Sequence, residues 1–125
     1  ENLQFAGRAD FILADWNDGT GDFTDFHIVL CNPPYIPVGD RDSLQPEVSQ
    51  YEPGGALFAG RDGLSEYSTL VALLPGLLKE GGWVFFEVGA GQAEAVAQML
   101  RGTGMHSLDI SPDLAGIGRC VRAKL

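Results

Sequence analysis

Short apolar runs, each bounded by turn-forming residues, divide the chain into predicted strands. They cover residues 11–14, 27–31, 83–88, 105–110 and 119–124. Most are near-continuously apolar rather than alternating, which is typical of strands buried on both faces of a sheet. The last two runs predict a closing pair of strands.

Two longer segments with helical spacing accompany these strands. One apolar stripe predicts a helix before residue 79; its members are Leu64, Tyr67, Leu70, Val71, Leu74, Leu77 and Leu78. Pro75 should kink or restart this helix, and residues 79–82 should end it. A second helix is predicted over residues 92–101. Its inward-facing residues are Ala93, Val96, Ala97 and Leu100.

The alternation of strands and helices predicts an α/β fold with a parallel sheet covered on both faces. Ligands of such folds bind at the carboxyl ends of the strands. The chain has 125 residues, which fits one domain. No apolar run approaches the roughly 18 residues of a membrane span, and we expect a cytoplasmic protein with no membrane association.

Charge and cysteine content narrow the function classes. Eight Lys and Arg stand against 17 Asp and Glu, which gives a net charge of −9. A nucleic-acid binder normally carries a basic surface to neutralise phosphates, so we expect no nucleic-acid partner. The two cysteines, Cys31 and Cys120, are too few for a disulfide framework, and we expect free thiols. No histidines stand at metal-ligand spacing, so no metal site is predicted.

The strongest chemical signal is the sequence Asn32, Pro33, Pro34, Tyr35 directly after a predicted buried strand. The two prolines stiffen the loop and have no N–H to occupy nearby acceptors. The Asn32 side-chain oxygen and a proline carbonyl can then accept both hydrogens of one NH2 group, and the Tyr35 ring can lie against a flat amide or base. Such a site orients the nitrogen lone pair for attack on a methyl sulfonium without a strong base. The alternative is a loop that only turns the chain.

Asp15 and Trp16 close the first predicted strand in the same way. The carboxylate can accept from an adenine amino group, and the indole can pack on the purine face. Equally, Asp15 can be a helix N-cap beside a half-buried Trp16. The residues themselves leave these two interpretations open.

The chain resembles the release factor glutamine methyltransferases over nearly its whole length. Residues 26–37, FHIVLCNPPYIP, look like the family's catalytic strand and loop. Residues 47–67, EVSQYEPGGALFAGRDGLSEY, are similar to the segment that follows it. Residues 81–92, GGWVFFEVGAGQ, and residues 113–116, DLAG, fit the next strand and a later loop. The Asn-Pro-Pro-Tyr loop also occurs in enzymes that methylate DNA adenine or ribosomal-RNA guanine, whereas the second stretch is more specific.

The resemblance implies functions for individual residues. Asn32, Pro33, Pro34 and Tyr35 would hold the glutamine amide as catalytic and substrate-binding residues. Glu52 joins the substrate-binding set, because it lies in the specific second stretch. Trp16 and Asn32 would contact S-adenosylmethionine, and Asp15 completes this cofactor-binding set. Two departures from the family pattern are His27 and Gly118, both where the family often has Asp.

The resemblance also implies the architecture, an incomplete Rossmann-like class I methyltransferase domain. Its mostly parallel sheet would have the family order 3-2-1-4-5-7-6, with a C-terminal antiparallel pair. Residues 1–125 would form the C-terminal part of one catalytic domain, without the first two strands, the Gly-rich cofactor loop and the N-terminal helical domain. We therefore expect no bound cofactor and no activity from this chain by itself. We also expect an exposed strand edge, relieved by self-association or by a shift of residues 11–14.

The function expected is methyl transfer from S-adenosylmethionine to a glutamine side-chain amide, with a peptide chain release factor as partner. An alternative is methylation of an exocyclic amino group in DNA or ribosomal RNA. A further alternative is an inert fragment or binding module. The acidic composition and the stretch that contains Glu52 and Pro53 argue against a nucleic-acid substrate.

Overall fold

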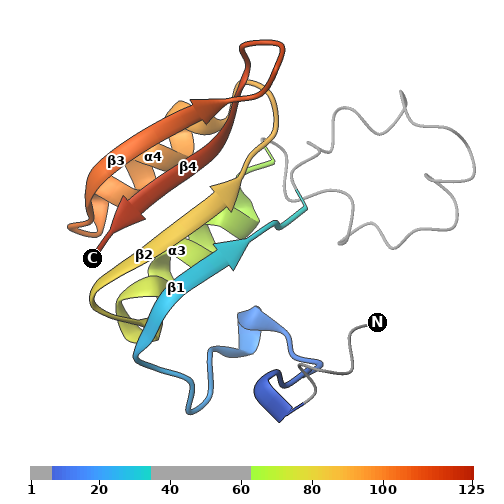
Figure 1. Ribbon diagram of the computed structural model, residues 1–125, viewed down its shortest axis with the longest axis vertical. Coiled ribbons are helices and arrows are strands. Elements are labelled where there is room, and N and C mark those ends of the chain that lie inside the picture. Colours follow the sequence, from blue (N-terminus) through green and yellow to red (C-terminus); the bar gives the residue numbers. More distant parts are fainter. Residues whose placement is uncertain (1–6, 35–62) are drawn as a thin grey trace, which may run out of the picture.

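The computed structural model describes residues 7–34 and 63–125 (Figure 1). Helices are α3 (Ser65–Leu77), α4 (Ala93–Gly102) and the short 3-10 helix η2 (Trp16–Asp18). Strands are β1 (Phe26–Cys31), β2 (Leu78–Glu87), β3 (His106–Pro112) and β4 (Gly118–Lys124). Four of the five predicted strands and both predicted helices are thereby confirmed, most with ends within about two residues.

The four strands form one sheet in the order β1-β2-β4-β3. Strand β1 pairs with β2 in parallel, whereas β4 is antiparallel to both β2 and β3. This order matches the predicted 4-5-7-6 portion of the family sheet and confirms the α/β class. The described sheet is mixed rather than mostly parallel, because β4 runs opposite to both of its neighbours.

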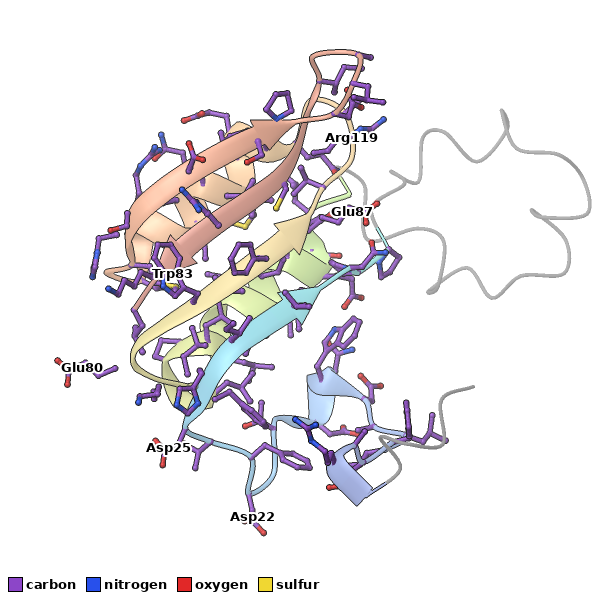
Figure 2. All side chains as sticks on the ribbon, viewed as in Figure 1. Asp22, Asp25, Glu80, Trp83, Glu87 and Arg119 are labelled. Carbon is purple, nitrogen blue, oxygen red and sulfur yellow. The ribbon has the colours of Figure 1, made fainter. Side chains whose placement is uncertain are left out.

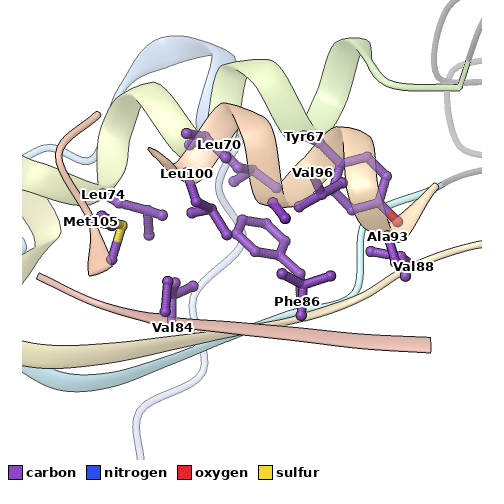
Figure 3. Close-up of a cluster of buried hydrophobic side chains, with 14 of the residues drawn as sticks. Tyr67, Leu70, Leu74, Val84, Phe86, Val88, Ala93, Val96, Leu100 and Met105 are labelled. Atoms are coloured by element: carbon purple, nitrogen blue, oxygen red, sulfur yellow. The ribbon is translucent and has the colours of Figure 1, made fainter. Parts of the chain in front are cut away.

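The core lies between one face of the sheet and the two helices (Figure 3). Alternate residues of β2 point toward the helices, so Val84 and Phe86 are fully buried. The Phe86 ring packs edge-on against Tyr67 of α3, with ring centroids 5.7 Å apart. All four residues predicted to face inward on the second helix are buried: Ala93, Val96, Ala97 and Leu100.

The opposite face of the sheet is open in the part of the chain that the structure describes. On β1, Ile28 and Leu30 are 57% and 76% exposed. On this face Arg122 and Lys124 lie over the Trp83 ring, 5.5 and 5.7 Å from its centroid. The prediction of helices on both faces is therefore wrong for the described residues, since α3 and α4 lie on the same side (Figure 1).

The first predicted strand, residues 11–14, is wrong as well. These residues form no strand, and Phe11 and Leu13 are 97% and 103% exposed. A strand requires backbone hydrogen bonds to a neighbour, and none of the described strands pairs with this segment. The predicted shift of residues 11–14 onto β1 does not occur either. The outer edge of β1 has no partner strand among the described residues.

The two cysteines lie on β1 and β4, which are separated by β2. Cys31 and Cys120 are both free thiols, so that prediction is confirmed. Burial raises the pKa of Cys31 to about 11. A thiol with so high a pKa is a poor nucleophile at neutral pH.

The junction of α3 and β2 differs from the prediction. Helix α3 contains Pro75 in its last turn and ends at Leu77, so residues 79–82 belong to β2 rather than to a helix end. Phe26 pairs with Leu78, and Ile28 pairs with Trp83. The single residue His27 on β1 therefore stands opposite four residues of β2, 79–82, which form a bulge. A Cβ atom on Gly82 would lie 2.9 Å from the carbonyl oxygens of both Lys79 and Phe26. The bulged pairing therefore requires glycine at this position.

We predict that Gly82→Ala lowers the free energy of unfolding by about 1–3 kcal/mol, because backbone atoms must move to admit the methyl group. Gly76→Ala is the control: Gly76 lies in α3, and an added Cβ meets nothing within 4 Å. The control should be neutral or stabilising by up to about 1 kcal/mol, since alanine favours helices. Urea unfolding followed by circular dichroism measures both changes, and equal stability of the two variants would contradict the steric argument.

Candidate functional site

The loop that begins at Asn32 leaves the sheet at the carboxyl end of β1. Cys31, the last residue of β1, pairs with Phe86, so the carboxyl ends of these parallel strands lie together. Pro33 is fully buried and anchors the start of the loop, whereas Asn32 is exposed. Tyr35 and Glu52 lie outside the described residues. The structure thus places an exposed carboxamide on a fixed backbone at the edge where ligands of α/β folds bind.

Asn32 lines a cavity of about 450 Å³ together with residues of β2 and β4. Its wall includes Phe85 and Glu87 from β2 and Arg119 from β4. Figure 2 shows Glu87 and Arg119 at one end of the sheet, opposite the end that carries Asp25 and Glu80. The lining is mainly apolar, and it includes one acidic residue, Glu87, and one basic residue, Arg119, in addition to Asn32. Such a cavity suits a small polar group on an apolar stem.

Arg119 is held at this cavity by the loop before β4. Its Nε donates to the Asp113 carboxylate at 3.2 Å. The other oxygen of Asp113 accepts from the backbone N–H groups of Ala115 and Ile117, at 2.8 and 3.0 Å. Donation from Ile117, with further contributions from Arg119 and Ala115, lowers the pKa of Asp113 despite some desolvation. Asp113 thus orders the loop and fixes Arg119, even though Gly118 departs from the family pattern.

Two side chains tie the end of β2 to the start of α3. Gln92 is 8% exposed; its Oε1 accepts from the Gly89 N–H at 3.0 Å, and its Nε2 donates to the Gly63 carbonyl at 3.3 Å. Tyr67 donates its hydroxyl proton to the Glu87 carbonyl at 2.8 Å. These contacts fix the backbone next to Asn32. The sequence analysis placed Tyr67 in an apolar stripe and Gln92 at a helix start, and included both in stretches that resemble the family, but it assigned neither of these hydrogen bonds.

The structure shows the structural roles that were left open for Asp15 and Trp16. Asp15 is the N-cap of η2, and its Oδ1 accepts from the backbone N–H and the side-chain Nδ2 of Asn17, both at 2.9 Å. Trp16 is half-buried against the core, and its Nε1–H donates to Glu66 Oε2 at 2.6 Å. Cofactor binding by this pair stays a prediction. Glu66 is a contact that no local sequence pattern indicated.

Three of the predicted site residues line two separate cavities, Asn32 the first one. Asp15 and Trp16 line a second cavity of about 750 Å³, which shares no lining residue with the Asn32 cavity. Within residues 7–34 and 63–125, no three His, Cys, Asp or Glu side chains cluster to hold a metal ion. No helix in these ranges is long and apolar enough to cross a membrane.

We predict that Gln92→Ala destabilises the chain by about 1–3 kcal/mol, because it leaves the buried Gly89 N–H and Gly63 carbonyl without this partner. Gln98→Ala is a matched control, since Gln98 is an exposed residue of α4, the helix that Gln92 precedes as N-cap. The control should change stability by less than about 0.5 kcal/mol. Urea midpoints measure both variants, and a small effect of Gln92→Ala would show that water replaces the side chain.

Comparisons with known proteins test the resemblance. No protein-family model matches the chain. The chain is 44% identical over 100 residues to the release factor glutamine methyltransferase of Geobacter sulfurreducens, with 80% of this chain and 35% of that protein covered. It is 40% identical over 117 residues to the enzyme of the same name from Rhodospirillum rubrum, with 94% of this chain and 35% of the relative covered.

A solved structure gives the same result. The release-factor-specific protein-(glutamine-N5) methyltransferase from Alicyclobacillus acidocaldarius is 31% identical, with a TM-score of 0.51. The match covers 80% of this chain and 48% of that structure. A third relative, from Cereibacter sphaeroides, is matched over 98% of this chain and 44% of its own length. The predicted resemblance is confirmed: the chain is related to the release factor glutamine methyltransferases and spans between about a third and a half of their length.

Proposed function

We propose that the protein that carries this chain transfers a methyl group from S-adenosylmethionine to the side-chain amide nitrogen of a glutamine in a peptide chain release factor. The observation that carries this proposal is the position of Asn32 and Pro33. They stand directly after β1, at the carboxyl edge of a sheet, in a chain related to enzymes of that name. The proposed catalytic and substrate-binding set is Asn32, Pro33, Pro34 and Tyr35, with Glu52 as a further substrate contact.

The chemistry proposed for Asn32 follows from the weakness of an amide nucleophile. The amide lone pair is delocalised into the carbonyl, so the nitrogen must be oriented as it attacks. Acceptance of both N–H groups by the Asn32 Oδ1 and a proline carbonyl directs the lone pair and stabilises positive charge that develops on nitrogen. The buried Pro33 holds these acceptors in place before the substrate arrives.

The proposed cofactor set fits a nucleoside. The exposed Asp15 carboxylate has Oδ2 without a hydrogen bond among the described residues, and this oxygen is able to accept from an adenine amino group. The half-buried Trp16 ring offers an apolar surface in a cavity of about 750 Å³. When bound, S-adenosylmethionine supplies the electrophilic methyl group. Asp15 and Trp16 would bind its adenosyl portion, while Asn32 would contact both the cofactor and the acceptor amide.

The full-length protein should transfer labelled methyl from S-adenosylmethionine to a release factor and not to DNA or ribosomal RNA. A release factor with its acceptor glutamine replaced by Ala is the control, and it should remain unlabelled. The net charge of −9 on this chain is the physical reason to expect poor binding of nucleic acid. Comparable labelling of nucleic acid would support the alternative of an amino-group methyltransferase. Calorimetric titration of the 125-residue chain with S-adenosylmethionine separately tests whether it binds cofactor by itself.

Asn32→Ala in the full-length enzyme should lower kcat by a factor on the order of 100 or more, because it removes an acceptor used as charge develops on nitrogen. The control is again Gln98→Ala, which removes an exposed carboxamide from α4. Steady-state methylation of the release factor measures both variants. Near-normal turnover of Asn32→Ala would show that Asn32 only shapes the loop.

A further inference from the structure

We infer that Glu66 is a positioning residue that fixes the Trp16 indole at the cofactor cavity. This inference rests on the proposed function, in which Trp16 contacts the adenosyl portion of the cofactor. The direct observation is the hydrogen bond from Trp16 Nε1 to Glu66 Oε2, at 2.6 Å and half-buried. The two residues are fifty positions apart in the chain, so the bond connects η2 to α3 across the fold.

The position of Glu66 in the fold suits a negatively charged hydrogen-bond acceptor. Glu66 is in the first turn of α3, where the positive end of the helix dipole stabilises a negative charge. Among the described residues no Lys or Arg forms an ion pair with it. Glu66 accepts a hydrogen bond from Trp16, and a hydrogen bond to a charged acceptor is stronger than one between neutral groups.

The orientation of Trp16 depends on this hydrogen bond, because few other contacts hold η2 in place. Residues 11–14 before Trp16 are exposed, and η2 contains no fully buried residue. Trp16 is the residue of η2 that packs against the hydrophobic core. A half-buried indole can occupy more than one side-chain rotamer. A hydrogen bond at Nε1 selects the rotamer that directs the N–H toward Glu66. Glu66 thus determines how the Trp16 ring borders the cavity.

A purely structural role for Glu66 makes different predictions. If the carboxylate only stabilised the start of α3, its removal would lower stability without a specific effect on Trp16. Glu94 is the matched control, because it occupies the first turn of α4 and is exposed. Glu66→Gln keeps an oxygen acceptor and removes the charge, and Trp16→Phe keeps an aromatic ring and removes the donor.

The test uses the full-length enzyme and S-adenosylmethionine as the probe. Glu66→Ala should weaken the calorimetric Kd for S-adenosylmethionine on the order of tenfold, as expected for a lost hydrogen bond to a charged group, with a smaller change in kcat. Glu66→Gln should recover part of this affinity, because a neutral oxygen acceptor remains, and Glu94→Ala should leave it unchanged. In a Trp16→Phe background, Glu66→Ala should have no further effect. An unchanged Kd for Glu66→Ala, or an equal loss in the Trp16→Phe background, would overturn the inference.

A second readout does not depend on the proposed function. The readout uses the 125-residue protein with Trp83→Phe, in which Trp16 is the remaining tryptophan. In this background and without ligand, Glu66→Ala should shift the Trp16 fluorescence to longer wavelength. Unchanged emission and anisotropy would show that Glu66 does not hold the ring. If emission shifts but the wild-type enzyme fails to bind S-adenosylmethionine, the proposed function fails and the cofactor part of this inference fails with it.

Discussion

The parallel pairing of β1 with β2 is the constraint on which the candidate site depends. It brings the carboxyl ends of two strands together, so that Asn32 after Cys31 lies beside the end of β2. The burial of Val84 and Phe86 against the helices holds β2 in register, because a slip by one residue would turn both side chains to the open face. The register that packs the core is therefore also the register that places Asn32 beside the end of β2.

The polar contacts at this edge add what apolar packing alone does not provide. Apolar contacts are non-directional, whereas the hydrogen bonds of Gln92 and Tyr67 join specific backbone atoms at Gly89, Gly63 and Glu87. Asp113 accepts from the Arg119 side chain and from the backbone N–H groups of Ala115 and Ile117. Each of these groups satisfies backbone atoms where the regular hydrogen bonding of a helix or strand stops, at the edge of the sheet where α/β folds bind ligands.

Much of the fold could be predicted from the sequence because its information is local. The apolar runs of β1 to β4 and the stripe of α4 identify elements before any contact is known. The failures depend on pairing between distant segments: residues 11–14 have strand composition but no partner strand among the described residues, and the glycines at 81 and 82 belong to a bulge in the pairing with β1 rather than to a helix end. In the site, Asn32 could be predicted because one short motif contains it. Glu66, Gln92 and Tyr67 act on residues 20 to 50 positions away, and no local pattern shows such contacts.

The first turn of α3 connects the two cavities that share no lining residue. Glu66 and Tyr67 are neighbours in sequence, and successive helix residues point about 100° apart. Glu66 therefore reaches Trp16 at the flank of the helix, while Tyr67 reaches the Glu87 carbonyl at the end of β2. Methyl transfer requires donor and acceptor to be held in one geometry. Because both contacts start from one rigid helical turn, they hold Trp16 and the end of β2 beside Asn32 in one relative position.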